Sequence, residues 1–497
     1  MEIFLEKIIS KFLSIVVVIF LVALVLLFSS VSFFSKLVLS FLLVIIFLAN
    51  FYFSKKFFIK NNLIIVFSLL FFLFYLFLNT YLVSKIQFES KTELLNFCFY
   101  ITTFFVFYEV FIQRSLEGEL VISFLIVQLF FFLVYIFGKE ELLNFFVYNT
   151  NIFACYCLFS WLFSFFYLYL KKQNKLLVFL TLTISSFFLL FLKSFSAIFV
   201  VIAVIVFVFI KNRFLKWVII VSLFLLFSVI NFNSVIDRMI WLVIGLKIWL
   251  EHFIFGVGLG NFKFYYPQYL TNVYIEPSIA TIFVHNYFVH LAAEIGVVGL
   301  FLFLFFIFYI LKKIKNKIFL YPLYGVLIQN FFDYVLYIPQ NSILFFIFLS
   351  SLAVEDKNKY MFEGKNRVVN LLYFLFLSIF LLYCIISFFK MDKIMVLVNS
   401  KQKDNFYKAV SLDETCWLGW KYLAVSFVEE DNLEEAKKMF INVIKTNPFD
   451  VESYFYISVI NFKFGNKSDG YKFLKQMLQV NPKLANKYIK ILKKELG

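Results

Sequence analysis

The residues with the clearest chemical potential lie close together in the second half of the chain. His285 is followed by His290 and Glu294, which are four residues apart and therefore share one face of a helix. Ionisable side chains at membrane depth are costly and often mark a functional site, whereas an imidazole near the membrane surface can exchange a proton near neutral pH. The pattern favours proton transfer at His285. A helix cap with two side chains satisfied by neighbouring helices explains the same residues equally well.

These residues belong to a chain with the composition of an integral membrane protein. Of its 497 residues, 63% are hydrophobic and 23% aromatic, which is more apolar surface than a soluble fold can hide. The sequence predicts an all-α, polytopic protein with about 12–13 transmembrane helices within residues 1–390. No small-residue cleavage site follows the first apolar run, so we expect that run to remain as a span. The expected spans are about 8–28, 33–53, 63–83, 94–113, 119–137, 150–170, 176–192, 196–210, 214–231, 286–311, 318–338, 340–354 and 369–389.

Clusters of basic residues orient these spans. Lys and Arg near helix ends stay on the cytoplasmic side, and five clusters share one side if the N-terminus is cytoplasmic. The clusters are Lys55/Lys56/Lys60, Lys171/Lys172/Lys175, Lys211/Arg213/Lys216, Lys312/Lys313/Lys315/Lys317 and Lys357/Lys359/Lys365/Arg367. The excess of 46 basic over 30 acidic residues therefore reflects topology and does not indicate nucleic-acid binding. With the same orientation of the spans across the membrane, segment 232–285 and residues 391–497 lie outside the cytoplasm.

Residues 391–497 form a different kind of region, in which charge rises and the apolar residues become periodic. Asn447-Pro448 recurs 34 residues later as Asn481-Pro482. Residues 405–482 therefore resemble two tetratricopeptide repeats, with a last helix near 483–495 as a cap, in a soluble α-helical domain. A plain helical hairpin bundle is the alternative.

Segment 232–285 is too polar and broken to cross the membrane. Its apolar residues between Ile236 and Leu250 recur at near-helical spacing, which predicts a helix along the outer membrane surface. Three spaced glycines follow in the run from Gly256 to Phe262. No strand precedes them, so they do not indicate a nucleotide site, and we expect them to permit a tight chain reversal.

The order of motifs in this region resembles the central signature of the O-antigen ligase and polymerase superfamily. The motifs cover about residues 190–355, and the rest of the membrane domain is similar by topology alone. The matching positions are Arg238, Trp241, the run Gly256-Val-Gly-Leu-Gly-Asn-Phe262, Tyr266-Pro267, His285-Asn286, Glu294, Gly296 and Gly299, followed by Asp333, Pro339 and Asn341.

The resemblance implies an enzyme that moves a glycan from an undecaprenyl diphosphate carrier to an acceptor at the outer face of the bacterial cytoplasmic membrane. The family's chemistry inverts the sugar carbon and needs no metal or other cofactor. By this resemblance, Arg238 is the first choice for holding the diphosphate, and His285 is the first choice for the base that deprotonates the acceptor hydroxyl. Further substrate-binding candidates are Lys193, Ser194, Lys247, Asn286, His290 and Glu294.

One departure from the family pattern concerns the second cation. Family members usually carry a Ser-Arg pair where this chain has Ser194 followed by Phe195, with Lys193 before it. Lys193 could supply the charge from one position earlier, or it could be an ordinary lysine that extends from a helix end towards the membrane surface. For Lys247 and His252 an ordinary surface role is the stronger interpretation, and Glu294 is equally well explained as structural.

Several functions stay open at this point. Ligase and polymerase share these motifs, and the acceptor can be a glycan, a lipid or a secreted protein, with the repeat region as a possible docking module for a protein partner. A transporter or flippase for a lipid-linked sugar, with His290, Glu294 and Asp333 along a polar pathway, predicts inverted repeats with broken helices, which the sequence does not indicate. The third hypothesis is a membrane scaffold whose membrane domain has no enzymatic or transport activity. We expect the five cysteines to form neither disulfides nor a metal site.

Overall fold

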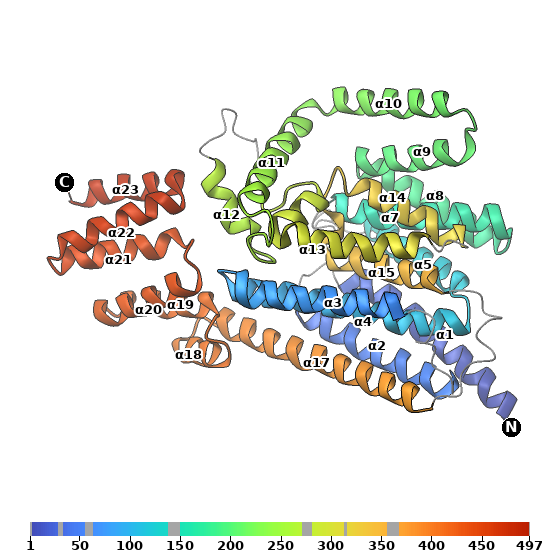
Figure 1. Ribbon diagram of the computed structural model, residues 1–497, viewed down its shortest axis with the longest axis horizontal. Helices are drawn as coiled ribbons and strands as arrows, with labels where there is room; N and C mark the ends of the chain where they lie inside the picture. Colours follow the sequence, from blue (N-terminus) through green and yellow to red (C-terminus); the bar gives the residue numbers. More distant parts are fainter. Residues whose placement is uncertain are drawn as a thin grey trace.

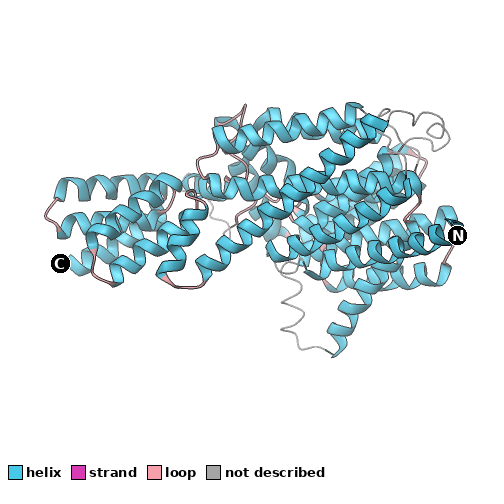
Figure 2. Ribbon diagram, turned by 90° about the horizontal axis from the view of Figure 1, so that it is seen from below, coloured by secondary structure: helices cyan, strands magenta, loops and turns pink. Residues whose placement is uncertain are grey.

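The computed structural model describes residues 2–27, 33–54, 63–137, 150–270, 281–312, 316–354 and 367–496. Within these ranges every regular element is a helix, as Figure 2 shows. In Figure 1 most helices form an elongated bundle with the N-terminus at one end, and the last six helices project beyond the other end. The basic clusters at 55–60 and 357–365 lie outside the described residues.

Nine helices of the described residues are long and apolar enough to cross a membrane. An α-helix satisfies its own backbone groups, which lipid cannot do. The helices are α1 (Glu2–Leu27), α2 (Phe33–Ser54), α3 (Leu63–Leu78) with its π-helical end η1 (Asn79–Val83), α4 (Gln87–Gln113), α5 (Glu117–Phe137), α7 (Thr150–Lys171), α10 (Arg213–Ile230), α13 (Tyr287–Lys312) and α17 (Arg367–Asn399). Three shorter apolar helices are α8 (Lys175–Phe191), α9 (Phe195–Phe209) and α15 (Pro339–Ala353). The chain is therefore a multi-pass membrane protein, while the count of 12–13 spans stays a prediction.

The span predicted at 318–338 is shorter in the structure. α14 (Lys317–Gln329) ends at Asn330, whose amide nitrogen donates to the Val326 carbonyl and whose amide oxygen accepts from the Leu336 N–H. The chain then turns into the single turn η3 (Val335–Tyr337), and Pro339 begins α15. This turn carries Asp333 to the end of the bundle.

Helix α4 lies at the centre of the bundle, and α10 lies at its edge. Every residue of the apolar window of α4 is buried, and its aromatic rings meet α17 and α13 edge to face at Phe99–Phe388 and Phe104–Phe306. None of the residues of α10 is buried, and the helix contacts only α9 and α11 (Phe232–Glu251) extensively. Figure 1 shows α10 running beside the bundle, where most of its surface faces the surroundings.

The projecting region consists of α18 (Lys403–Leu412), α19 (Trp417–Glu429), α20 (Leu433–Thr446), α21 (Val451–Lys463), α22 (Lys467–Val480) and α23 (Pro482–Leu496). Helices α21 and α22 begin and end 34 residues after α19 and α20, which is the period of the sequence pattern. Asn432 and Asn466 cap the second helix of each pair, because the side-chain oxygen of each accepts a hydrogen bond from the N–H three residues later. The region thus contains two equivalent helical pairs, and their identity as tetratricopeptide repeats stays a prediction.

Polar and aromatic contacts attach this region to the bundle. Lys91, near the start of α4, donates to the Asp413 carboxylate at 2.9 and 3.0 Å and to the Thr415 hydroxyl at 2.9 Å. The short helix α12 (Phe262–Tyr269) lies between the two parts, with the Tyr265 ring 4.5 Å from the Phe449 ring. The projecting region therefore stands over the segment that follows α11.

Candidate functional site

The segment predicted as an external loop is mostly helical. Helix α11 buries Ile240, Trp241, Ile244 and Ile248, which form a separate small core with residues of α12 and the start of α13. The sequence predicts that this apolar face rests on the outer membrane surface. The structure instead packs it against protein: a Cβ at Gly245 would lie 2.8 Å from a methyl carbon of Val284, just before α13, and 3.1 Å from one of Val289 in α13.

The glycines that follow α11 fit against a break in α13. Gly296 has a φ of 67° inside α13, so the helix is interrupted there. The turn after α11 pairs with the interrupted backbone: the Val257 and Gly258 N–H groups donate to the Ala293 and Glu294 carbonyls, each at 2.9 Å. In the other direction, the Val297 N–H donates to the Phe253 carbonyl at 2.9 Å. The glycines thus permit a close backbone contact and not only the predicted chain reversal.

Side chains from α3, from its π-helical end η1 and from the segment before α4 hold this turn from the opposite side. Asn79 in η1 donates to the Phe255 carbonyl and accepts from the Leu259 N–H, both at 2.8 Å. The Tyr75 hydroxyl donates to the Ile295 carbonyl at 2.5 Å, and the Asn261 amide donates to Ser84 Oγ at 2.6 Å. The turn is therefore a rigid part of the membrane domain.

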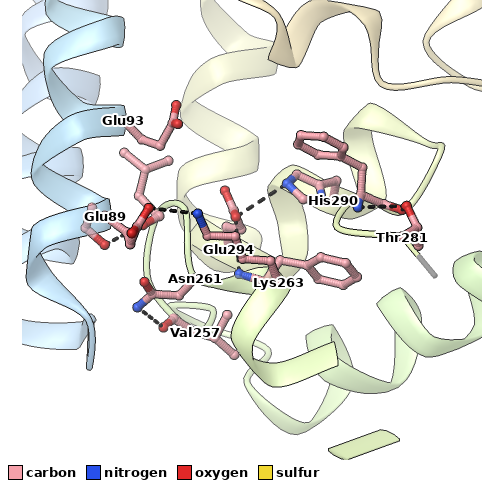
Figure 3. Close-up of polar contacts among 12 residues, drawn as sticks. Glu89, Glu93, Val257, Asn261, Lys263, Thr281, His290 and Glu294 are labelled. Atoms are coloured by element: carbon pink, nitrogen blue, oxygen red, sulfur yellow. Dashed lines mark hydrogen bonds and ion pairs between the residues drawn. The ribbon is translucent and has the colours of Figure 1, made fainter. Parts of the chain in front are cut away.

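Glu294 and His290 lie beneath this turn. Figure 3 shows the two side chains pointing towards each other, and Glu294 Oε1 lies 3.4 Å from His290 Nε2. Both are only 1% exposed, and Glu294 Oε1 also accepts from the Phe262 N–H at the start of α12. On the same side of the turn, Lys263 pairs with Glu89 at 2.7 Å. This cluster positions α12, and neither His290 nor Glu294 lines the pocket described next.

A pocket of about 600 Å³ lies on the other side of α11, bounded by α7, α9, α10 and the turn after α14. Lys193, Arg238, His285 and Asn286 all line it, so the structure brings together four of the predicted site residues. Its remaining polar lining consists of Thr150, Asn151, Ser196, Ser228, Asn231 and Ser234. Its apolar lining includes six phenylalanines: Phe195, Phe199, Phe224, Phe227, Phe331 and Phe332. The pocket thus combines cationic, polar and aromatic side chains in its lining.

His285 is held in the pocket by three neighbours. Its Nδ1 lies 3.4 Å from Asp333 Oδ1, and the side chains of the two residues are 15% and 1% exposed. The Trp241 ring stacks on the imidazole with centroids 4.4 Å apart, and the Tyr334 ring meets it edge to face at 4.7 Å. Because Nδ1 faces Asp333, Nε2 is the nitrogen available for a ligand. His285 itself has a φ of 53°, a backbone conformation that few non-glycine residues adopt.

The other predicted candidates occupy different places. Ser194 is buried and donates to the Asn151 side chain at 2.9 Å, so it supports the pocket wall without lining it. Lys247 is exposed on α11 and does not line the pocket. Asn286 lines the pocket, and its amide oxygen also accepts from the Val289 N–H at the start of α13, which makes it a helix cap.

The sequence did not predict that Asn151, Asn231 and Ser228 line a pocket, or that Asp333 contacts His285. The first three are ordinary polar residues near helix ends, where no pattern distinguishes them. Asp333 stands inside the predicted motif that ends at Asn341, but its partner His285 is distant in the chain and only the turn after α14 brings them together.

Burial shifts the pKa values of several side chains near the site. Burial raises the pKa of Tyr266 in α12 to about 12, so its phenol stays protonated at neutral pH. Burial and the nearby Lys85 lower the pKa of His252, and the coulombic effect of Glu251 opposes them. His252 ends α11 and contacts the Tyr265 ring, in keeping with a structural role. Within the described residues, no group of three or more His, Cys, Asp or Glu side chains is arranged to hold a metal ion.

Comparison with known proteins adds one finding. A search of curated proteins finds no match. Residues 158–304 match the sequence model of the family described as O-antigen ligase. The matched stretch runs from α7 into α13 and contains Lys193, Arg238 and His285, and it stops before Asp333. The family implies glycan transfer of the ligase or polymerase type in surface polysaccharide synthesis, and the match supports the assignment of this multi-pass membrane protein to the O-antigen ligase superfamily.

Proposed function

We propose that the protein transfers or polymerises a glycan from an undecaprenyl diphosphate carrier at the outer face of the bacterial cytoplasmic membrane. The observation that supports this most directly is the composition of the pocket. Lys193, Arg238 and His285 provide cations and an imidazole, while phenylalanines from α9 and α10 provide an apolar surface. A lipid diphosphate has the same two parts, a polyanionic group and a hydrocarbon chain.

The proposed reaction assigns one task to each polar residue. The acceptor oxygen bonds to the anomeric carbon as the bond from that carbon to the diphosphate oxygen breaks, which inverts the sugar carbon. His285 Nε2 takes the hydroxyl proton of the acceptor. Arg238 binds the leaving diphosphate with its planar guanidinium, and Lys193 adds a second, less directional charge to neutralise the developing anion.

Matched substitutions test the proposal. We expect His285→Ala to lower transfer by about 10²- to 10⁴-fold, because general base catalysis contributes that much. Arg238→Ala should lower it by about 10²- to 10³-fold through the loss of charge stabilisation. Transfer is measured with purified protein and a lipid-linked donor, together with polymer attachment or chain length in cells.

The controls are His252→Ala, at the end of α11, and Arg213→Ala, an exposed residue at the start of α10 far from the pocket. Both should retain wild-type transfer. Normal polymer from His285→Ala and Arg238→Ala variants that are present in the membrane at wild-type levels would rule out an enzymatic role for this pocket.

The orientation with a cytoplasmic N-terminus is part of the proposal. It is supported by the basic residues that follow α7 and α9 and by the separation of the N-terminus and the projecting helices at opposite ends of the bundle in Figure 1. We infer that the projecting helices are tetratricopeptide-like repeats outside the cytoplasm, where they can receive a glycan, lipid or protein acceptor or an assembly partner. Labelling of a single cysteine placed at Glu414 by a membrane-impermeant reagent in intact spheroplasts would support this side, and labelling only after lysis would exclude it.

A flippase is the competing function, and the break in α13 is the feature that favours it. Transporters use broken helices because the unpaired backbone groups at the break bind substrate or ions. In this protein the turn 253–258 already pairs with the Ala293, Glu294 and Val297 backbone groups. The break therefore serves packing, and the transferase proposal accounts better for the pocket. Retention of lipid-linked donor on the cytoplasmic face in a strain that lacks the protein would favour the flippase.

A further inference from the structure

The projecting region is divided sharply by charge. Residues 403–462 contain six lysines and ten acidic residues, so 6 − 10 gives −4. Residues 463–490 contain seven lysines and one aspartate, so 7 − 1 gives +6. Residues 403–462, from α18 to α21, therefore form an acidic half, whereas α22 and the described side chains of α23 form a strongly basic half.

The lysines of the two halves also differ in their contacts. In the acidic half, Lys403 pairs with Glu430 at 2.5 Å, Lys421 with Asp450 at 2.9 Å and Lys438 with Glu435 at 2.5 Å. In the basic half the single acid, Asp469, is engaged with its capping partner Asn466. No ion pair is present among the described side chains of Lys463, Lys467, Lys472, Lys475, Lys487 and Lys490, all of which are exposed. We call these six residues the lysine surface.

The hairpin of α22 and α23 brings several of these lysines to the same levels. The two helices pack against each other and are joined at Asn481. Lys475 and Lys487 each lie six residues from Asn481, and Lys472 and Lys490 each lie nine residues from it. In a helical hairpin, residues equally distant from the turn lie at similar levels along the two helices. The lysine surface therefore places positive charge at matching levels on both helices of the hairpin.

The direction of α23 argues against a flat membrane as the partner. A basic helix that binds a lipid surface lies in the plane of that surface. Figure 1 shows α23 running in the same direction as the membrane helices α3 and α17, so its axis is roughly perpendicular to the membrane plane. The helix also lies beyond the end of the bundle. An extended soluble polyanion fits this geometry better.

We propose that the lysine surface binds an acidic glycan chain, as acceptor or as growing product of the transfer. The proposal rests on the proposed function, because an acidic glycan is a polyanion that a transferase of this kind would handle. Repeated carboxylate or phosphate groups along the chain would meet paired levels of lysines on α22 and α23. Such binding is electrostatic and therefore weakens with salt.

The test uses the full-length protein in nanodiscs of neutral lipid and a fluorescent polygalacturonate as the acidic glycan. We expect binding that falls by about tenfold between low and physiological salt. Dextran of similar length, which is neutral, should not bind. The triple variant Lys472→Gln, Lys475→Gln, Lys487→Gln should bind polygalacturonate at least about tenfold more weakly.

The matched control removes three lysines from the acidic half: Lys408→Gln, Lys438→Gln and Lys445→Gln. It changes the net charge by the same amount and should bind as the wild type does. Equal affinities of the two triple variants, or equal binding of dextran, would overturn the proposal. Acetylation of Lys472 and Lys475 is also compared in nanodiscs of phosphatidylglycerol without any glycan. If these nanodiscs protect the two lysines from acetylation, the partner is a lipid and the proposal is overturned.

The two proposals can fail separately. The His285→Ala variant should bind polygalacturonate with wild-type affinity, because His285 lies in the membrane domain and not on the projecting helices. Binding without transfer by the wild type would contradict the proposed function alone. Transfer without binding would contradict the lysine surface alone.

Discussion

His285 depends on neighbours that the chain supplies from two separate elements, α11 and the turn that joins α14 to η3. Asp333 comes from the turn after α14, Trp241 from α11 and Tyr334 from the residue before η3. A carboxylate beside one ring nitrogen fixes the orientation of an imidazole and stabilises its protonated form, as in other enzymes that use histidine as a base. Asp333 is therefore a positioning residue in the proposed site, and it does not line the pocket itself.

Replacement of Asp333 by asparagine should mainly affect the chemical step. We expect kcat to fall by about 10- to 100-fold, because the imidazole loses its charged partner. KM for the lipid-linked donor should stay near the wild-type value, because Lys193 and Arg238 remain in place. Steady-state kinetics at several donor concentrations separates the two constants. A rise in KM at unchanged kcat would show that Asp333 acts on binding instead.

The break in α13 is the feature that connects the elements of the site. Gly256 and Gly296 both have a φ near 70°, and a Cβ on either would lie within 2.3 Å of a carbonyl oxygen of the opposite segment. The backbone hydrogen bonds across this contact fix the turn 253–258, and this turn joins α11, which carries Arg238, to α12. A side chain at either glycine must therefore push the two segments apart.

Gly296→Ala tests this contact at the level of the elements. We expect a loss of stability of about 1–3 kcal/mol or more, since the residue combines a left-handed backbone with a backbone clash. Thermal unfolding of the detergent-solubilised protein should show a lower Tm, and transfer should fall as α11 shifts. Gly118→Ala is the control, because a Cβ at Gly118 in α5 has no atom within 4 Å. An unchanged Tm for Gly296→Ala would contradict the rigid contact.

At the scale of the whole molecule, the projecting helices are attached to the membrane domain by few but specific contacts. Lys91 and Asp413 form an ion pair at 2.9 Å, and Thr415 shares both partners. Burial alone would raise the pKa of Asp413, but the Thr415 hydroxyl and the Lys91 ammonium outweigh it and hold that pKa below its usual value. The attachment is thus stabilised by the ionised form of Asp413.

This stabilisation predicts a pH dependence with a definite sign. Because the pKa of Asp413 is depressed in the folded state, its contribution is complete above the pKa of an unfolded aspartate, about 3.9, and is lost as the pH falls further. Limited proteolysis between α17 and α18 should accelerate in that acidic range for the wild type. The Asp413→Asn variant should be cleaved faster already at neutral pH, and Asp404→Asn, an exposed residue of α18, should not. Equal cleavage of the two variants at neutral pH would contradict this attachment.

The sequence by itself determined the features that depend on local pattern. A run of apolar residues of bilayer length predicts a helix wherever it packs, so most spans and the all-helical class follow from hydropathy alone. The sequence repeat likewise predicts the offset of 34 residues between α19 and α21, because each helical pair repeats the same local pattern. The motif around His285 and Arg238 also stands out, because charged residues are costly beside a membrane.

Only the tertiary structure decided which of these residues meet. The side chains of Lys193, Arg238 and His285 come from three elements, and their approach depends on helix packing that no local pattern encodes. His290 and Glu294 contact each other and the start of α12 outside this pocket, and their predicted part in substrate binding stays a prediction. The packing of α11 on α13, the pairing of the turn 253–258 with the break at Gly296, and the return of Asp333 to His285 all join residues distant in the chain. Their physical cause is the pairing of buried backbone groups and the close fit of small residues, which is a property of the assembled bundle.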